Sequence, residues 1–210
     1  FTIENQEVLP ARTSTIEIEI APEDSPENRS YISFGKILGH FYELKKKIAM
    51  SIVHSILVGT NEAPLKKAIL ESGLAQDVDY SLETELQQPF SILMLVNTEE
   101  EHLEKIKEVI RFVTKDYHFD PKELEASING MEFHYREKSE PAGLLNSLHS
   151  LETWLYDGDP IDGIQLSSIF NELREEISTS YFEEMMKEFW ELVVERIDEA
   201  YMKDYEEKYH

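Results

Sequence analysis

Three histidine–carboxylate pairs in the chain have a spacing that suits metal binding. In His40–Glu43 the two residues stand at i and i+3, which are neighbours on one face of a helix. Glu99–His102 and Glu207–His210 have the Glu-x-x-His spacing of carboxylate-bridged di-iron bundles. A metal site needs three or four converging ligands, and a chain with 43 acidic residues produces such pairs by chance. The sequence therefore favours ordinary helix-surface pairs, with no metal ligand among them.

An aspartate-rich run, Asp157–Gly163, has the look of a calcium-binding loop. Such a loop requires glycine at its sixth position, which Asp162 occupies here. The sequence therefore predicts a plain turn at this point.

Signatures of nucleophilic and nucleotide chemistry are missing from the sequence. It contains no Gly-x-Ser-x-Gly elbow, no phosphate-binding loop with a terminal lysine and no Gly-x-Gly-x-x-Gly run. With no cysteine, a Cys–His dyad is excluded. A Ser–His–Asp triad stays open at this level, because its three residues meet only in space. No catalytic residue is predicted.

The charge balance of the chain is strongly acidic. Lys plus Arg total 20 and Asp plus Glu total 43, so the formal net charge is −23. This charge repels phosphate backbones and anionic lipid headgroups, so neither nucleic acid nor a membrane surface is an expected partner. Cationic or amphipathic peptides would be attracted instead.

The sequence also predicts where the protein resides. No stretch approaches 18 consecutive apolar residues, and the first residues, FTIE, form neither a basic nor an apolar leader region. The absence of cysteine leaves no disulfide framework and fits a reducing compartment. We therefore expect a soluble, cytoplasmic protein.

Period-two alternation predicts four strands in the first half of the chain. They cover residues 15–20, 31–38, 81–87 and 90–96, the last of them apolar enough to be buried. A proline-marked loop separates the first two strands and Gln88-Pro89 separates the last two. Each couple is expected to pair as a hairpin, which predicts an antiparallel sheet.

Helical periodicity dominates the rest of the chain. Apolar residues four apart predict a helix over about 41–58. For the next helix, Asn61 is the expected cap, Pro64 lies in the first turn and Gly73 ends it. Further apolar stripes follow, listed by their members: Leu103, Ile106, Ile110 and Val113; Leu124, Ile128, Met131 and Tyr135; Leu144, Leu148, Leu151 and Leu155; Leu166, Ile169, Leu173 and Ile177; Phe182, Met185, Phe189, Val193 and Ile197.

Capping boxes predict three of these helix starts, at Thr98 with Glu101, Asp120 with Glu123, and Ser180 with Glu183. Strands early and helices late, without βαβ alternation, indicate an α+β fold.

Three phrases of the sequence resemble one protein family. Ile56–Gly73, Glu125–Glu137 and Gly143–Pro160 are similar to segments of the insulinase/pitrilysin superfamily of inverted-motif zinc metallopeptidases, and more narrowly of its presequence-protease subgroup. The resemblance covers roughly residues 30–190 and implies an antiparallel sheet covered by helices on one face, an insulinase/mitochondrial-processing-peptidase-like metallohydrolase unit. It divides the chain into a leading strand and loop (1–29), a zinc-free α+β domain (30–190) and an acidic helical tail (191–210).

Members of this superfamily are zinc endopeptidases built from four related units that close around a peptide. Their zinc unit carries His-x-x-Glu-His, in which the histidines bind the metal and the glutamate activates water. No such motif occurs here. Aligned with that helix, Met50 and Val53 stand where the first ligand and the general base would be, and only His54 remains. We therefore interpret His54 as a packed helix residue.

The resemblance thus implies the zinc-free second unit of the amino-terminal half of a longer peptidase. Such a unit would be non-catalytic, would hold no cofactor while zinc sits in the parent enzyme, and would form part of the chamber wall beside the zinc domain. Its expected partners are the remaining domains and unstructured peptide substrates, although the sequence assigns no substrate-binding residue. An exposed apolar face could also make the isolated chain self-associate.

Two alternatives remain open at this level. A stand-alone zinc-less homologue would act as a scaffold or partner subunit. An autonomous metalloenzyme would use the Glu-x-x-His pairs.

Overall fold

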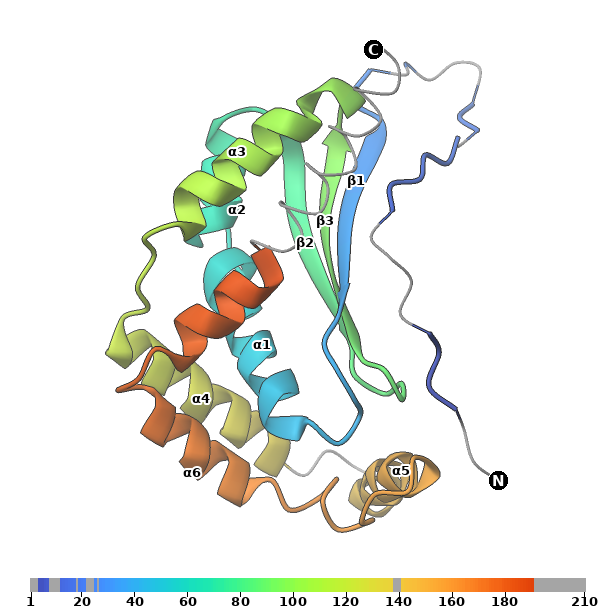
Figure 1. The fold of residues 1–210 in the computed structure, drawn as a ribbon, viewed down its shortest axis with the longest axis vertical. Coiled ribbons are helices and arrows are strands. Elements are labelled where there is room, and N and C mark those ends of the chain that lie inside the picture. The colour runs from blue at the N-terminus through green and yellow to red at the C-terminus, as the bar shows by residue number, and fades with distance from the viewer. Residues whose placement is uncertain are drawn as a thin grey trace.

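A three-stranded antiparallel sheet forms the centre of the fold (Figure 1). The structure, a computed structural model, describes residues 4–7, 12–17, 19–21, 25, 27–137 and 141–190. Its strands are β1 (Ser30–Ile37), β2 (Ala75–Glu83) and β3 (Phe90–Thr98), and they lie in the order β1-β3-β2. β3 is the most apolar of the three, and it takes the central position, where both of its edges are hydrogen-bonded.

The second predicted hairpin is confirmed, and the first is wrong. β2 and β3 pair antiparallel from Glu83–Phe90 to Ala75–Thr98, so β2 begins six residues before the predicted 81. β1 pairs with β3 and not with residues 15–20, whose described members form no strand and are exposed. Alternation specifies which face of a strand is wet, but it does not specify the neighbouring strand. Here the apolar β3 is the better partner for β1.

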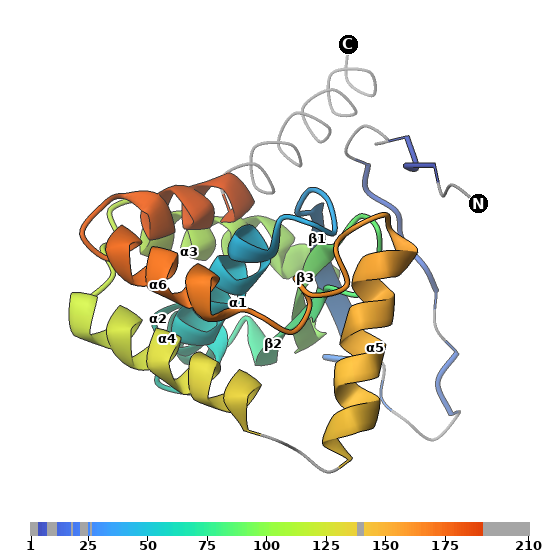
Figure 2. The ribbon, with the colours of Figure 1, turned by 90° about the horizontal axis from the view of Figure 1, so that it is seen from below.

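Helices cover one face of the sheet (Figures 1 and 2), which confirms the predicted α+β architecture. The described part of the chain contains no helix long and apolar enough to cross a membrane. The α-helices are α1 (Leu44–Val58), α2 (Pro64–Glu71), α3 (Leu103–Thr114), α4 (Pro121–Arg136), α5 (Ala142–Leu155) and α6 (Ser167–Glu176). A short 3-10 helix, η1 (Glu100–His102), precedes α3, and residues 181–190 form one further described helical segment.

The core lies between the sheet and this helical layer. α1 runs through its centre, with Ile52, Val53 and Leu57 fully buried. Leu93 and Leu95 of β3 meet it from the sheet, and the other elements contribute Leu65, Ile69, Ile106, Ile110, Ile128, Phe170, Leu173, Phe182, Met186, Phe189 and Trp190. The predicted stripe on α5 does not join this core, because its four leucines are exposed.

The predicted helix caps have mixed outcomes. Asp120 is the N-cap of α4, and its carboxylate accepts a hydrogen bond from the Lys122 backbone N–H at 2.9 Å. Thr98 instead ends β3 and donates to the Leu74 carbonyl. Ser180 stands directly before the helix at 181–190, as predicted, and its hydroxyl donates to Glu184. The prediction of a cap at Asn61 is also wrong. The cap position of α2 is Ala63, with Pro64 first in the helix and Gly73 at φ +69° after its last turn.

Replacing the α4 cap should destabilise the protein modestly. Asp120→Ala removes an acceptor from an otherwise unpaired first-turn N–H, and we expect the free energy of unfolding to fall by about 1 kcal/mol. Urea unfolding at neutral pH measures this loss. Asp120→Asn is the matched control, because its side-chain oxygen retains the cap. Equal losses in both variants would show that the cap is not the cause.

Candidate functional site

The α1 residues that align with the zinc motif lie inside the protein core. Met50, Val53 and His54 are all buried. The His54 ring packs between aromatic side chains, 4.9 Å from the Phe189 ring and 5.1 Å from the Tyr80 ring by their centroids. Burial lowers the pKa of His54 to about 3, so its imidazole is neutral at physiological pH. These contacts confirm that His54 is a packed helix residue.

The sequence pairs with metal-ligand spacing do not converge. Residues 38–43 precede α1 instead of continuing it, so the prediction that His40–Glu43 shares a helix face is wrong. The Glu43 carboxylate accepts a hydrogen bond from the His40 backbone N–H at 2.6 Å. Glu99 accepts from the Asn28 backbone, and the His102 ring nitrogen lies 3.0 Å from the Leu74 carbonyl. Glu207–His210 lies outside the described residues.

No group of three or more potential ligands occurs in the part of the chain that the structure describes. Asp157–Gly163 forms turns, as predicted, and Asp159 accepts from the backbone N–H of Ile161 at 2.9 Å. At Gly163 a Cβ atom would lie 2.5 Å from the His149 carbonyl oxygen. Glycine is therefore needed for close packing against α5.

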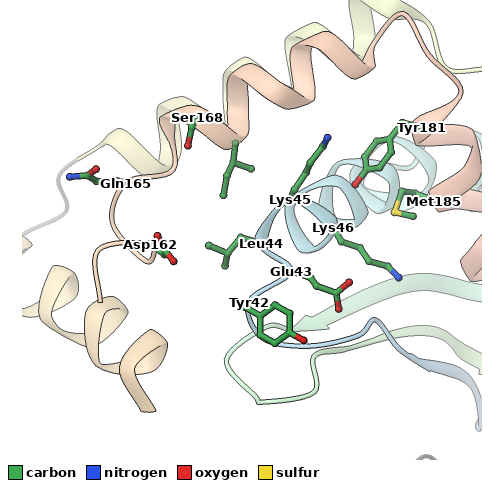
Figure 3. A pocket seen from close by; sticks show the side chains of 11 residues that line it. Tyr42, Glu43, Leu44, Lys45, Lys46, Asp162, Gln165, Ser168, Tyr181 and Met185 are labelled. Carbon is green, nitrogen blue, oxygen red and sulfur yellow. The ribbon is translucent and has the colours of Figure 1, made fainter. Parts of the chain in front are cut away.

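A pocket of about 540 Å³ lies in the helical layer (Figure 3). It is bordered by the start of α1, by the connection into α6 and by the 181–190 helix. Its lining residues are Tyr42, Glu43, Leu44, Lys45, Lys46, Asp162, Gln165, Ser168, Ile169, Tyr181 and Met185.

The two lysines that line this pocket are paired with nearby carboxylates. The Lys45 ammonium lies 2.7 Å from Glu176, and the Lys46 ammonium lies 2.8 Å from Glu188. Burial, reinforced by nearby carboxylates, raises the pKa of Tyr181 to about 12, which keeps its phenol protonated. The pocket thus presents satisfied ion pairs and no cluster that indicates a ligand.

The opposite face of the sheet has a more specific pattern. Leu93 and Leu95 point into the core, so the alternate residues of β3 point away from the helices. These residues form a half-buried apolar row along the middle strand: Phe90, Ile92, Met94 and Val96. We call this side of the sheet the open face.

An acidic row flanks the apolar row on the β2 edge. Asp77 pairs with Val96 across the strands, Asp79 with Met94, and Glu83 with Phe90. All three acidic side chains belong to exposed residues. The Lys66 ammonium lies 2.7 Å from Asp77, and its hydrogen bond lowers the pKa of that carboxyl.

The other edge of the open face, on β1, is neutral. Ser33, Gly35 and Ile37 lie opposite Met94, Ile92 and Phe90, and all three are exposed. The described residues between 12 and 21 run on the same side of the sheet (Figure 2) and are all exposed.

In shape and charge this arrangement is complementary to an extended or helical peptide that is apolar on one side and cationic on the other. The apolar row would bury aliphatic side chains, and the acidic row would attract Lys or Arg beside them. Sequence reasoning missed Asp77 and Asp79 because it began the strand at residue 81. The alternation of Asp77 and Asp79 with Val78 and Tyr80 is the signal that could have found them.

A protein-family model matches the sequence from near its start to the middle of α4. The family described as "Peptidase M16 inactive domain" matches residues 3–131. Protein HypA of Clostridium perfringens is 28% identical over 176 residues, which are 81% of this chain and 18% of that protein. Presequence protease 1 of Arabidopsis thaliana is 34% identical over 143 residues, 65% of this chain and 13% of that protein. The chain therefore spans less than a fifth of the length of either relative.

Solved structures share the fold. The inactive peptidase domain of a Bordetella parapertussis protein assigned as a zinc protease has a TM-score of 0.53 at 13% identity, covering 75% of this chain and 82% of that one. A protease from Helicobacter pylori has a TM-score of 0.55 at 14% identity, covering 76% of this chain and 38% of that one. The family match covers more than half of the sequence, and the chain therefore belongs to the peptidase M16 inactive-domain family.

Proposed function

We propose that the chain is a non-catalytic domain of a zinc-dependent metalloendopeptidase that degrades peptides, and that its open face forms part of the wall of the substrate chamber. One observation carries the proposal. An apolar row and an acidic row lie side by side on a face of the sheet that the described helices leave uncovered. Such a surface suits an unstructured peptide with apolar and cationic residues.

The zinc that the family implies does not fit this unit. At the aligned positions Met50 offers a thioether, Val53 offers no donor, and His54 is enclosed by aromatic rings. Zinc in proteins takes imidazole, thiolate and carboxylate ligands from several side chains together. In our proposal the metal and the hydrolytic step belong to another domain of the parent, and this domain contributes binding alone.

The acidic character of the chain supports a role in peptide capture. A net charge of −23 attracts cationic peptides over about a Debye length and raises their encounter rate. The relatives' much greater length favours a domain of a longer polypeptide over a stand-alone scaffold, which is the second candidate. Reading the gene that encodes the chain would separate the two.

A cleavage assay tests the proposal. An unstructured, quenched cationic peptide is incubated with this chain alone, with the separately expressed remainder of its parent, and with both together. We expect turnover only in the mixture, because binding surface and zinc chemistry then occur in one assembly. Chelator-sensitive turnover by this chain alone would overturn the proposal and favour an autonomous metalloenzyme.

A further inference from the structure

α5 turns a polar side toward the rest of the domain and an apolar side toward solvent, the reverse of the other helices. Thr153, on one side of the helix, is only 2% exposed. The opposite side presents Leu144, Leu148, Leu151 and Leu155 at four- and three-residue spacing, each between 44% and 57% exposed. Trp154, at 65% exposed, lies beside them. We call these five residues the α5 ridge.

The polar side and the C-terminal end of α5 attach it to the rest of the domain. The Tyr156 ring packs on Phe41 at 4.9 Å, and its hydroxyl donates to the Glu85 carbonyl at 3.2 Å. The Glu152 carboxylate attracts the Lys47 ammonium electrostatically. The same ammonium lies 4.1 Å from the Phe41 ring centroid. Because these contacts fix the polar side of α5 against the domain, the side chains of the α5 ridge point toward solvent.

α5 also stands apart from the helical layer. It lies beyond the end of the sheet where the β2–β3 hairpin turns (Figures 1 and 2). A contiguous row of leucines with a tryptophan is the composition of an interface core, in which large apolar side chains supply most of the binding energy. A helix exposed in this way loses the stabilisation that burial of its apolar side would give.

The charge and the relatives' length decide between possible occupants of the ridge. Each copy of the chain has a net charge of −23, so two copies repel each other strongly. An anionic lipid surface is repelled for the same reason. The curated relatives are more than five times longer than the aligned segment, so a longer polypeptide supplies other domains at high effective concentration.

We infer that the α5 ridge is the surface through which this domain docks on another domain of the same longer polypeptide, at an apolar patch that is neutral or basic. The inference rests on the proposed function, since it requires a parent chain with further domains.

Hydrogen exchange of the α5 amides tests this inference. It is measured in the natural polypeptide that contains this chain and in the 210-residue chain alone. We expect α5 amides to exchange about tenfold or more slowly in the longer polypeptide, because docking suppresses local opening. Leu148→Gln with Leu151→Gln should abolish that difference, since glutamine retains helix propensity and charge while it removes the apolar contact. Phe112→Gln, at an 85% exposed position on α3, is the matched control and should leave the difference intact.

Each other outcome contradicts a specific part of the account. Equal α5 exchange in both proteins would overturn the docking inference while leaving the chamber-wall proposal standing. Concentration-dependent protection in the short chain, with dimers in sedimentation, would identify a second copy as the occupant and refute the inferred one. If the natural polypeptide consists of this chain alone, with no further domain on either side, the proposed function fails first.

Discussion

His54→Asn is expected to remove an acid-sensitive component of the protein's stability. Burial lowers the pKa of His54 from 6.5 to about 3 in the folded state. Between these values the unfolded state binds one more proton than the folded state, so the free energy of unfolding falls as the pH falls. Between pH 7.5 and pH 4.5 this linkage lowers the free energy of unfolding of the wild-type protein by about 2–3 kcal/mol. The asparagine variant has no imidazole at this position, so it does not show this decrease.

Urea unfolding of both proteins at several pH values measures this effect. The difference in free energy of unfolding between the wild-type protein and His54→Asn should decrease by about 2–3 kcal/mol between pH 7.5 and pH 4.5. The control is His118→Asn, which removes an imidazole that is 86% exposed and lies 3.8 Å from Glu183. A loss of the same size there would show that the effect is not specific to the buried ring. If the free energies of unfolding of the wild-type protein and His54→Asn changed in parallel with pH, the imidazole would titrate freely in the folded protein. The closed α1 core would then be wrong.

Neutralising the acidic row should weaken the binding of cationic peptide strongly. We expect Asp77→Asn, Asp79→Asn and Glu83→Gln together to lower the affinity about tenfold to a hundredfold at low salt, because three attractive charges are lost. The Lys66 ammonium would also lose its partner and repel the peptide. Fluorescence anisotropy with a labelled amphipathic peptide measures this affinity.

A matched variant separates local from global charge. Glu108→Gln, Glu125→Gln and Glu175→Gln change the net charge equally, but these exposed residues belong to α3, α4 and α6. This control should lose far less affinity. Raising the salt from about 0.02 M to about 0.3 M should remove most of the difference between the two triple variants. Equal losses in both would show that peptide responds only to overall charge and has no preferred face.

Local patterns were sufficient to predict much of the fold. α1, the cap at Asp120 and the β2–β3 hairpin follow from residues within a few positions of each other. Even the burial of His54 is consistent with its place on an apolar helix. In each of these cases the physical cause acts within one turn or one hairpin.

The remaining features depend on contacts between distant segments. The sequence did not predict that β1 would pair with β3, because alternation gives no information on strand neighbours. It showed an apolar stripe on α5, but not which way the stripe faces, since that direction depends on Tyr156 meeting Phe41. The acidic row was missed because the predicted strand began at residue 81 and left out Asp77 and Asp79, which belong to β2.

The most direct test of the account is to locate the bound peptide on the surface. The chain has no cysteine, so Met94→Cys on the open face and Phe112→Cys on α3 each accept one photoreactive label. Irradiation with an unstructured cationic peptide should give several-fold more adduct at position 94 than at position 112. Equal adduct at both positions, or more at position 112, would contradict the claim that the open face of this zinc-free domain holds peptide.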